Sequence, residues 1–316
     1  MELHFLGTGA GMPSKERNVS SVALKFLQRG GEVWLFDCGE ATQHQILHTS
    51  AIKPRKITKI FITHLHGDHI FGLPGLLGSR SFQSGEDSLL TVYGPPGIKE
   101  YLEICLKVSS TYLTYPFEVV EISEGLVCEE NGRRVYSSLL DHVIPCFGYR
   151  VEESTQPGKL KAELLQKSGV SPGPLYQELK KGKDLTLPDG TVLKSKDFLS
   201  APVPGRIITI LGDTKACDNA IKLGKDATVL VHEATFLHEL AEQAAEFGHS
   251  SAKIAALTAR KANASSLIIN HISSRYHKEQ KHLLLEEARE VFPNTSMAND
   301  FSVFPLEKPI AADMEK

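Results

Sequence analysis

Residues 63–69 read Thr63-His-Leu-His-Gly-Asp-His69 and directly follow the apolar run 57–62. His64, His66, Asp68 and His69 therefore place four ligand-type side chains close together. Two imidazoles at alternate positions can bind one metal ion, while the carboxylate and the third imidazole beyond them can reach a second ion. Neutral imidazole and carboxylate suit zinc, and suit manganese or iron less decisively. A histidine-rich surface loop without a function would leave this clustering unexplained. The run therefore predicts a binuclear metal site.

The pattern H-x-H-x-D-H after a strand resembles the signature of the metallo-β-lactamase superfamily. The remaining ligands of that superfamily arrive singly at the ends of later strands, and His142, Asp213 and His271 stand in the matching order. Each follows four or more mostly β-branched or aliphatic residues, as expected of a buried strand that delivers a polar side chain to a sheet edge. The resemblance implies a ligand set of five histidines and two aspartates: His64, His66, Asp68, His69, His142, Asp213 and His271.

Length and composition agree with such a fold without selecting it. The 316 residues can bury one domain, or one domain with an insertion. The net charge is only −3, so a polyanionic partner needs a local basic patch. The five cysteines are widely spaced and contain no C-x-x-C pair, which indicates reduced thiols in a cytoplasmic protein. We expect no signal peptide and no membrane-spanning segment.

Short apolar strands alternate with amphipathic helices along the chain, which predicts sheets covered by helices. We expect strands at 3–6, 19–26, 33–36, 59–63, 89–93, 135–140, 147–151, 206–211, 228–232 and 267–270. Helices are expected at 40–49, 98–108, 218–223, 250–261 and 279–291. The order of these elements resembles the αββα sandwich of the superfamily. The expected fold class is therefore α+β, a metallo-β-lactamase sandwich with an inserted projecting arm.

Residues 152–199 interrupt this pattern with a segment rich in Lys, Gly and Pro. Between Lys159 and Lys183 it carries six lysines against two glutamates. The stretch "LTLPDGTVL" predicts two short strands around an Asp189-Gly190 turn. A solvated insertion without a function is one interpretation. However, Gly173-Pro174 followed by a Lys-rich helix resembles the arm with which ribonuclease Z enzymes hold tRNA.

Further motifs strengthen the resemblance to ribonuclease Z. "PSKERN" at 13–18 is similar to the P-x-K-x-R-N loop near the acceptor-stem end, and "HEAT" stands complete at 232–235. "GHSS" at 248–251 differs from the family's G-H-S-T only by Ser251, and "HISSRY" at 271–276 is family-like. "FDCGEATQ" at 36–43 resembles the first motif, in which Asp37 orients ligands. The chain is identified as a member of the short-form ribonuclease Z family from its first strand to about residue 304.

The resemblance implies the following organisation. Residues 1–151 and 200–308 form the two halves of the metallo-β-lactamase domain, 152–199 form the tRNA-binding arm, and 309–316 form a tail. The substrate would be contacted by Lys15, Arg17, Asn18, Gly173, Pro174, Lys180, Lys181 and Arg275.

The implied chemistry is zinc-dependent removal of 3′ trailers from tRNA precursors. Two zinc ions per subunit, about 3.5 to 4 Å apart, would lower the pKa of a shared water towards about 7. The first would be held by His64, His66 and His142, the second by Asp68, His69 and His271, and Asp213 would bridge them. Asp68 would orient or deprotonate the nucleophile, while His249, supported by Glu233, would protonate the leaving 3′-oxygen. The products would be a tRNA with a 3′-hydroxyl and a trailer with a 5′-phosphate. Family members act as homodimers.

Three alternatives remain. A small-molecule hydrolase of the superfamily would share the ligands but has no use for a Lys-rich arm or for "PSKERN". A zinc phosphodiesterase acting on small diesters is closer. A non-catalytic RNA-binding relative would be expected to have lost ligands, and none is missing from the sequence. No DNA partner is expected.

Overall fold

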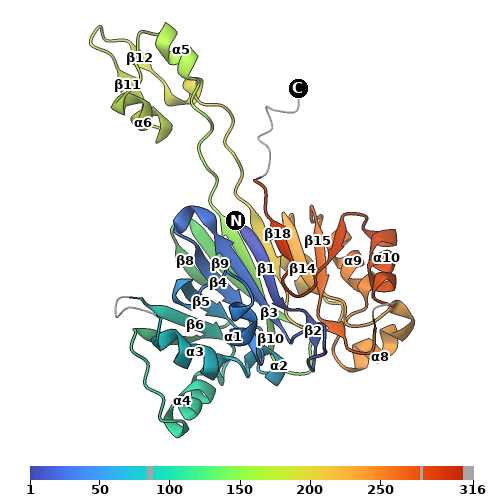
Figure 1. Cartoon of the computed structure of the whole chain (residues 1–316). Helices are drawn as coiled ribbons and strands as arrows, with labels where there is room; N and C mark the ends of the chain where they lie inside the picture. The colour runs from blue at the N-terminus through green and yellow to red at the C-terminus, as the bar shows by residue number, and fades with distance from the viewer. Residues whose placement is uncertain (84–87, 278–279, 309–316) are drawn as a thin grey trace. The chain divides into compact units, whose positions relative to one another are not determined.

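The chain divides into two compact units in a computed structural model that describes residues 1–83, 88–277 and 280–308. The larger unit contains Met1–Val151 and Ile207–Leu306, and the smaller unit is built from Glu152–Arg206. Figure 1 labels the elements of both. The predicted tail at 309–316 lies outside the described residues, as does Glu279, the first residue of the last predicted helix.

Two mixed sheets form the centre of the larger unit. The first has the order β18-β1-β3-β4-β5-β6-β7 and the second has the order β17-β15-β14-β13-β10-β9-β8. The first comprises β1 (Glu2–Gly7), β3 (Ser21–Phe26), β4 (Glu32–Phe36), β5 (Ile57–Phe61), β6 (Leu90–Gly94), β7 (Phe117–Glu121) and β18 (Val303–Pro305). The second comprises β8 (Gly125–Glu130), β9 (Arg133–Leu140), β10 (Cys146–Glu153), β13 (Ile207–Ile210), β14 (Val229–Glu233), β15 (Leu267–Asn270) and β17 (Thr295–Met297).

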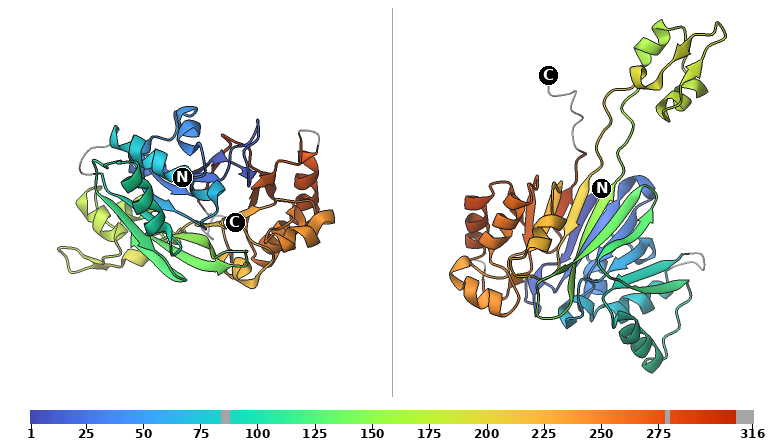
Figure 2. Two further views of the ribbon diagram at one scale, coloured as in Figure 1. Left: turned by 90° about the horizontal axis from the view of Figure 1, so that it is seen from below. Right: turned by 180° about the vertical axis from the view of Figure 1, so that it is seen from behind.

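The apolar side chains divide among three layers of core. One cluster, which includes Phe5, Phe36, Tyr149 and Val231, draws on the strands of both sheets and fills the space between them. A second lies under the helices of the first sheet and a third under those of the second. These helices are α1 (Thr42–Leu47), α2 (Gly67–Ile70), α3 (Leu73–Ser81), α4 (Ile98–Val108), α7 (Asp218–Leu223), α8 (Ala241–Glu246), α9 (Ala252–Lys261) and α10 (Lys281–Val291). Figure 2 shows the resulting helix, sheet, sheet, helix order, which confirms the predicted αββα sandwich.

The parallel strands of both sheets bring three of the predicted ligands to one edge. Strands β4, β5, β6 and β7 run parallel, as do β13, β14, β15 and β17. The carboxyl ends of parallel strands meet at a common edge. His64 follows β5, Asp213 follows β13 and His271 follows β15. Each ligand is thus placed by a buried strand whose own sequence is apolar.

Several predicted elements differ from the observed ones. Helices α2 and α3 are not predicted by the sequence pattern, because the stretch from Gly67 to Ser81 is rich in Gly and contains Pro74. Strands β7 and β8 are edge strands with many exposed residues and lack a strong apolar run. The helix predicted at 250–261 begins at Ala252, because the hydroxyl of Ser251 accepts a hydrogen bond from the Ile254 amide and caps it.

The smaller unit has its own apolar cluster of Leu165, Val170, Leu179, Leu193 and Phe198. Around it lie α5 (Ala162–Lys167), α6 (Pro174–Lys180), β11 (Leu185–Thr186) and β12 (Val192–Leu193). The two short strands are antiparallel, as predicted. The unit extends to Arg206, whereas the sequence placed the segment at 152–199, because bridges join Gln156 to Val203 and Leu160 to Leu199. The chain segments that enter and leave the smaller unit are therefore paired with each other.

Candidate active site

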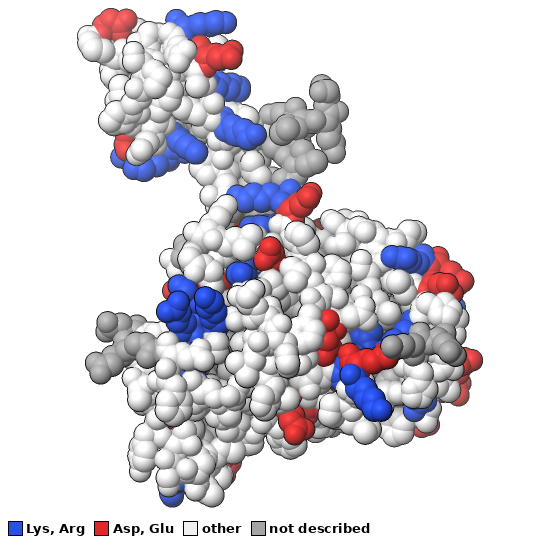
Figure 3. Space-filling view, in the orientation of Figure 1, with Lys and Arg blue, Asp and Glu red and all other residues white. Residues whose placement is uncertain are grey.

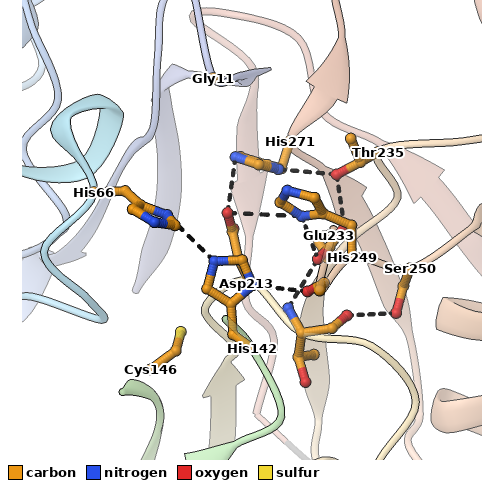
Figure 4. Close-up of polar contacts among 12 residues, drawn as sticks. Gly11, His66, His142, Cys146, Asp213, Glu233, Thr235, His249, Ser250 and His271 are labelled. Carbon is orange, nitrogen blue, oxygen red and sulfur yellow. Dashed lines mark hydrogen bonds and ion pairs between the residues drawn. The ribbon is translucent and has the colours of Figure 1, made fainter. Parts of the chain in front are cut away.

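The seven predicted ligands converge at the edge of the sandwich, together with His249 and Glu233. Four overlapping groups have ligand atoms within 4.8 Å of one another. They are His64, His66 and His142; His64, His69 and Asp213; Asp68, His69 and His271; and Asp213, His249 and His271. Figure 4 shows the side chains around Asp213, with His66 and His142 on one side and His249 and His271 on the other. Residues more than 200 positions apart therefore form one cluster.

The separations between ligand atoms fit metal coordination. Around a tetrahedral zinc with ligands at about 2.1 Å, neighbouring ligand atoms lie about 3.4 Å apart. The His271 Nε2 atom lies 3.4 Å from Oδ2 of both Asp68 and Asp213, and His69 Nε2 lies 3.4 and 3.5 Å from the same two atoms. His66 Nδ1 lies 3.1 Å from His64 Nε2 and 3.2 Å from His142 Nε2.

A buried nitrogen without a hydrogen-bond partner supports a cation in this cluster. His69 is 2% exposed, and its Nε2 atom makes no hydrogen bond within the described part of the chain. An unpartnered buried polar atom is costly, and a bound metal would remove that cost. Asp213 Oδ2 also lies 3.7 Å from His64 Nε2, so this oxygen reaches ligands of both predicted ions. The donor set fits two divalent ions.

Four of the histidines have Nδ1 engaged on the side away from the cluster. His69 Nδ1 lies 2.7 Å from Oδ2 of Asp37, and His142 Nδ1 lies 2.8 Å from the Gly248 carbonyl oxygen. His64 Nδ1 lies 2.9 Å from the Thr63 hydroxyl, and His271 Nδ1 lies 3.0 Å from the Thr235 hydroxyl. Partners of this kind fix the tautomer and ring orientation of metal-binding histidines. In all four, Nε2 is left to face the cluster.

Electrostatics keep two of the ligands, His64 and Asp213, in the protonation states that metal binding requires. Burial lowers the pKa of His64, and neighbouring histidines lower it further, so its imidazole is neutral. Burial disfavours the charged form of Asp213, but His271 and His69 outweigh this effect and hold its pKa well below its usual range. Asp213 and Asp37, by contrast, outweigh burial and raise the pKa of His69 well above its usual range, so a metal ion that binds there displaces a proton from this ring.

His249 and Glu233 form a separate ion pair beside the ligands. The Nδ1 atom of His249 lies 3.0 Å from Oε1 of Glu233, which is 2% exposed. Burial alone would lower the pKa of His249, but the Glu233 carboxylate and then Asp213 raise it to about 9. Since Nδ1 is engaged, Nε2 is the nitrogen that can deliver a proton. The pair has the composition of a general acid and its supporting base.

The glycine-rich segment after β1 contacts the cluster through its backbone. The Gly11 amide donates to Oδ2 of Asp68 at 2.8 Å, with Gly11 at a φ of +69°. The adjoining strand β2 (Gly9–Ala10) pairs with β16 (Ile272–Ser273), directly after His271. Gly248 is required for a different reason, because a Cβ atom there would lie 2.6 Å from His142 Nδ1. Gly248 belongs to the "GHSS" motif, but the roles of both glycines are visible only in the three-dimensional arrangement.

Within the "PSKERN" segment, Arg17 is buried whereas Lys15 is exposed. Arg17 is 4% exposed and donates to the Thr8 hydroxyl, the Ala298 carbonyl and Asn299 Oδ1. Its guanidinium therefore lies inside the protein, which does not agree with the expected contact to substrate. Asn18 is also occupied, because its side chain donates to the Glu40 carbonyl.

Lys15, by contrast, is exposed and lines a cavity of ≈ 630 Å³. The other residues around this cavity include Tyr276, His277 and Lys281. Lys281 forms an ion pair with Glu16, and both residues line the cavity. The exposed Arg275 lies over the Phe236 ring at 4.7 Å, and that ring lies 6.3 Å from the ring of His249.

The remaining substrate residues lie in the smaller unit. Gly173 precedes α6 in an exposed position, Pro174 is its first residue, and Lys180 and Lys181 close it. All six lysines between Lys159 and Lys183 are exposed, and Lys181 and Lys183 pair with Glu178. Figure 3 shows basic side chains on the face of this unit that it draws. In the described parts of the chain, no helix is both long and apolar enough to cross a membrane.

Comparisons with known proteins agree with this geometry. The family described as "Anti-Pycsar protein Apyc1" matches residues 1–131. Ribonuclease Z of Bacillus cereus (strain G9842) is 57% identical over 98% of this chain and 100% of its own length. Ribonuclease Z of Bacillus thuringiensis (strain Al Hakam) is 56% identical over the same shares.

Two solved structures are also similar to this chain. Human tRNase Z, short form, is 31% identical with a TM-score of 0.70, covering 98% of this chain and 100% of the human chain. A metallo-β-lactamase fold protein of Bacillus subtilis is 17% identical with a TM-score of 0.67, covering 96% and 99%. The second likeness concerns the fold alone.

The sandwich and its His and Asp cluster define a metal-binding hydrolase of the metallo-β-lactamase fold. Identity of 57% over nearly the whole chain then narrows the class, and the chain belongs to the ribonuclease Z family of endoribonucleases.

Proposed function

We propose that this protein is an endoribonuclease that removes 3′ trailers from tRNA precursors, leaving a 3′-hydroxyl on the tRNA and a 5′-phosphate on the trailer. The observation that carries the proposal is the complete ligand cluster with the His249–Glu233 pair beside it, in a chain 57% identical to ribonuclease Z. A relative without catalytic activity would be expected to lack part of this set.

The proposed cofactor is zinc, with two ions per subunit. His64, His66 and His142 would hold the first, Asp68, His69 and His271 the second, and Asp213 both, in agreement with the separations between their ligand atoms. When bound, the two ions supply Lewis-acid stabilisation of the phosphoryl charge and an acidified water. Asp68, whose Oδ2 is held by the Gly11 amide, would orient the attacking nucleophile.

The leaving group is the ribose 3′-oxygen, which needs a proton. His249 would donate it from Nε2, while the Glu233 carboxylate holds Nδ1 and favours the protonated ring. Arg275, exposed and stacked on Phe236, would contribute a positive charge near the same end of the site.

We further propose that Gly173, Pro174, Lys180, Lys181 and the other exposed lysines of the smaller unit bind the body of the tRNA. Lysine contacts to phosphates act at long range and need no sequence recognition. A homodimer, in which the smaller unit of one subunit serves the site of the other, is the assembly implied by the family. A cytoplasmic location fits the five free cysteines.

A phosphodiesterase of small substrates is the main alternative, because the same fold supports other hydrolases. One comparison separates the two: cleavage rates of a 3′-extended pre-tRNA, a chromogenic phosphodiester and a thioester, each with zinc and with a chelator. We expect zinc-dependent cleavage of the pre-tRNA at far lower enzyme concentration than of the diester, and no cleavage of the thioester. Preference for either small substrate would favour the alternative.

A further inference from the structure

Thr235 lies between a proposed zinc ligand, His271, and the carboxylate of Glu233 that supports the proposed proton donor. It is 3% exposed, and its Oγ1 atom lies 2.6 Å from Oε2 of Glu233 and 3.0 Å from Nδ1 of His271. Figure 4 shows this hydroxyl between the imidazole and the carboxylate. One side chain therefore contacts both the carboxylate that supports His249 and a proposed zinc ligand.

Counting protons fixes the direction of these hydrogen bonds. An ionised carboxylate only accepts, so the single hydroxyl proton of Thr235 is donated to Glu233. The hydroxyl can then only accept from His271, so the proton of a neutral His271 lies on Nδ1. Its lone pair is left on Nε2, which lies 3.4 Å from Oδ2 of both Asp68 and Asp213. That is the tautomer that a metal ligand needs.

No other described group duplicates these hydrogen bonds. Oε1 of Glu233 accepts from the Thr214 amide at 2.8 Å and from His249 Nδ1 at 3.0 Å. Within the described ranges, Thr235 is the one hydrogen-bond partner of Oε2 of Glu233 and of Nδ1 of His271. Without the hydroxyl, a buried donor and a buried acceptor would both be left without partners.

We propose that Thr235 is a positioning residue that sets the tautomer of His271 for zinc and the rotation of the Glu233 carboxylate for His249. The second half of this inference rests on the proposed function, whereas the first concerns zinc binding alone. Thr235 thereby couples the second proposed zinc site to the proton donor.

Zinc affinity tests the first half. Thr235→Ala removes the hydroxyl without placing a new methyl group against two polar atoms, Thr235→Val keeps the volume, and Thr235→Ser restores the hydroxyl. The matched control is Thr209→Val. Thr209 is also buried, in β13 beside the strand that leads to Thr235, and its hydroxyl donates to the Leu223 carbonyl, away from the site.

In competition with a chromogenic chelator, we expect Thr235→Ala and Thr235→Val to bind one of the two zinc ions, the one held by His271, about 10–100-fold less tightly. Thr235→Ser and Thr209→Val should match the unmodified protein. Wild-type zinc affinity in a folded Thr235→Ala protein would overturn the inference.

The ratio of two activities tests the second half. At saturating zinc, Thr235→Ala should lose more activity on pre-tRNA, whose leaving group needs a proton, than on bis-(p-nitrophenyl) phosphate, whose leaving group does not. In a His249→Ala background this extra loss should disappear, because Thr235 acts through Glu233 on His249. An unchanged ratio, or an extra loss that persists without His249, would contradict the coupling. If the unmodified protein fails to cut pre-tRNA, the proposed function fails, while the zinc titration still decides the role of Thr235 towards His271.

Discussion

The Nδ1 atom of His69 lies 2.7 Å from Oδ2 of Asp37, the residue that directly follows strand β4. Asp37 is 6% exposed, and it also accepts from the Thr63 amide at 2.8 Å and from the Thr63 hydroxyl at 2.9 Å. Since that hydroxyl faces Nδ1 of His64, one carboxylate orients two of the proposed ligands. This relationship explains why an acidic residue outside the ligand set lies buried beneath the site.

Asp37→Asn should therefore weaken zinc binding by about 10–100-fold without unfolding the protein. Asparagine tolerates the left-handed backbone at this position, where φ is +58°. However, it offers one acceptor oxygen in place of two, and its amide group would face other donors. Competition with a chelator measures the affinity, and the thermal midpoint controls for folding. Unchanged zinc affinity would show that His69 and His64 are held by other means.

Asp213→Ala should abolish turnover and reduce the zinc content below two ions per chain. The Oδ2 atom of Asp213 lies within 3.7 Å of His64, His69 and His271, so the effect of removing it cannot be confined to one ion. Metal analysis after dialysis gives the stoichiometry. Two tightly bound ions in an active variant would contradict the shared role of this carboxylate.

His249→Ala should slow pre-tRNA cleavage by about 10²–10⁴-fold, as is usual when a general acid is removed. Zinc content should remain unchanged. The effect should be much smaller on a diester with a nitrophenolate leaving group, because that group leaves without a proton. Parallel rate measurements on the two substrates decide the matter, and an equal effect on both would assign His249 to metal binding or to structure.

The smaller unit offers a test that separates affinity from chemistry. Replacing residues 157–199 with a short Gly-Ser linker leaves the bridge between Gln156 and Val203 to close the gap. Hydrolysis of a small diester should survive, because none of the seven proposed ligands lies in this segment. Pre-tRNA binding should weaken, and its salt dependence should fall by about 0.7 to 0.9 for each phosphate that the protein no longer neutralises.

Single-lysine variants refine that test. Lys181→Ala removes a lysine paired with Glu178, and Lys99→Ala removes a similarly exposed lysine paired with Glu103 in the larger unit. Only the first should reduce the salt dependence of pre-tRNA binding. If the deletion protein binds pre-tRNA like the intact chain, the unit does not clamp tRNA. If it no longer hydrolyses the diester either, the unit is part of the core fold.

Arg17 and Lys15 should behave in opposite ways although they are near neighbours. Arg17→Gln removes a buried guanidinium with three hydrogen-bond acceptors, so the free energy of unfolding should fall by about 1–3 kcal/mol. Lys15→Gln should leave stability unchanged and reduce the salt slope of pre-tRNA binding by about 0.7 to 0.9. Denaturant unfolding and a salt series measure the two effects, and the reverse pattern would restore the substrate role expected for Arg17.

The metal cluster can be predicted from sequence because each ligand follows a strand with a strong apolar pattern. His142, Asp213 and His271 are recognisable in this way. Parallel strands bring Asp213 and His271 together, whereas His142 follows β9, which pairs antiparallel with β8. The direction of a side chain in a loop carries no comparable signal. The charge of Arg17 suggests that it faces substrate, yet Thr8, Ala298 and Asn299 hold it inside.

The roles of Thr235 and Gly248 are visible only in the structure. Each acts through a contact with a residue from another strand or loop, His271 for Thr235 and His142 for Gly248. Local composition cannot report such pairs. The helices α2 and α3 escape prediction for a different reason, because glycine has a low intrinsic helix propensity and tertiary packing outweighs it here.

Mapping both ends of the cleavage products tests the central claim most directly. A pre-tRNA with a 3′ extension is incubated with the zinc-loaded protein, and the new termini are identified by ligation and by phosphatase sensitivity. We predict one cut at the 3′ end of the tRNA body, giving a 3′-hydroxyl on the tRNA and a 5′-phosphate on the trailer, and no cut after removal of zinc or in the Asp213→Ala variant. Cleavage that leaves a 3′-phosphate, that begins at the trailer's free end, or that persists without metal would contradict the account.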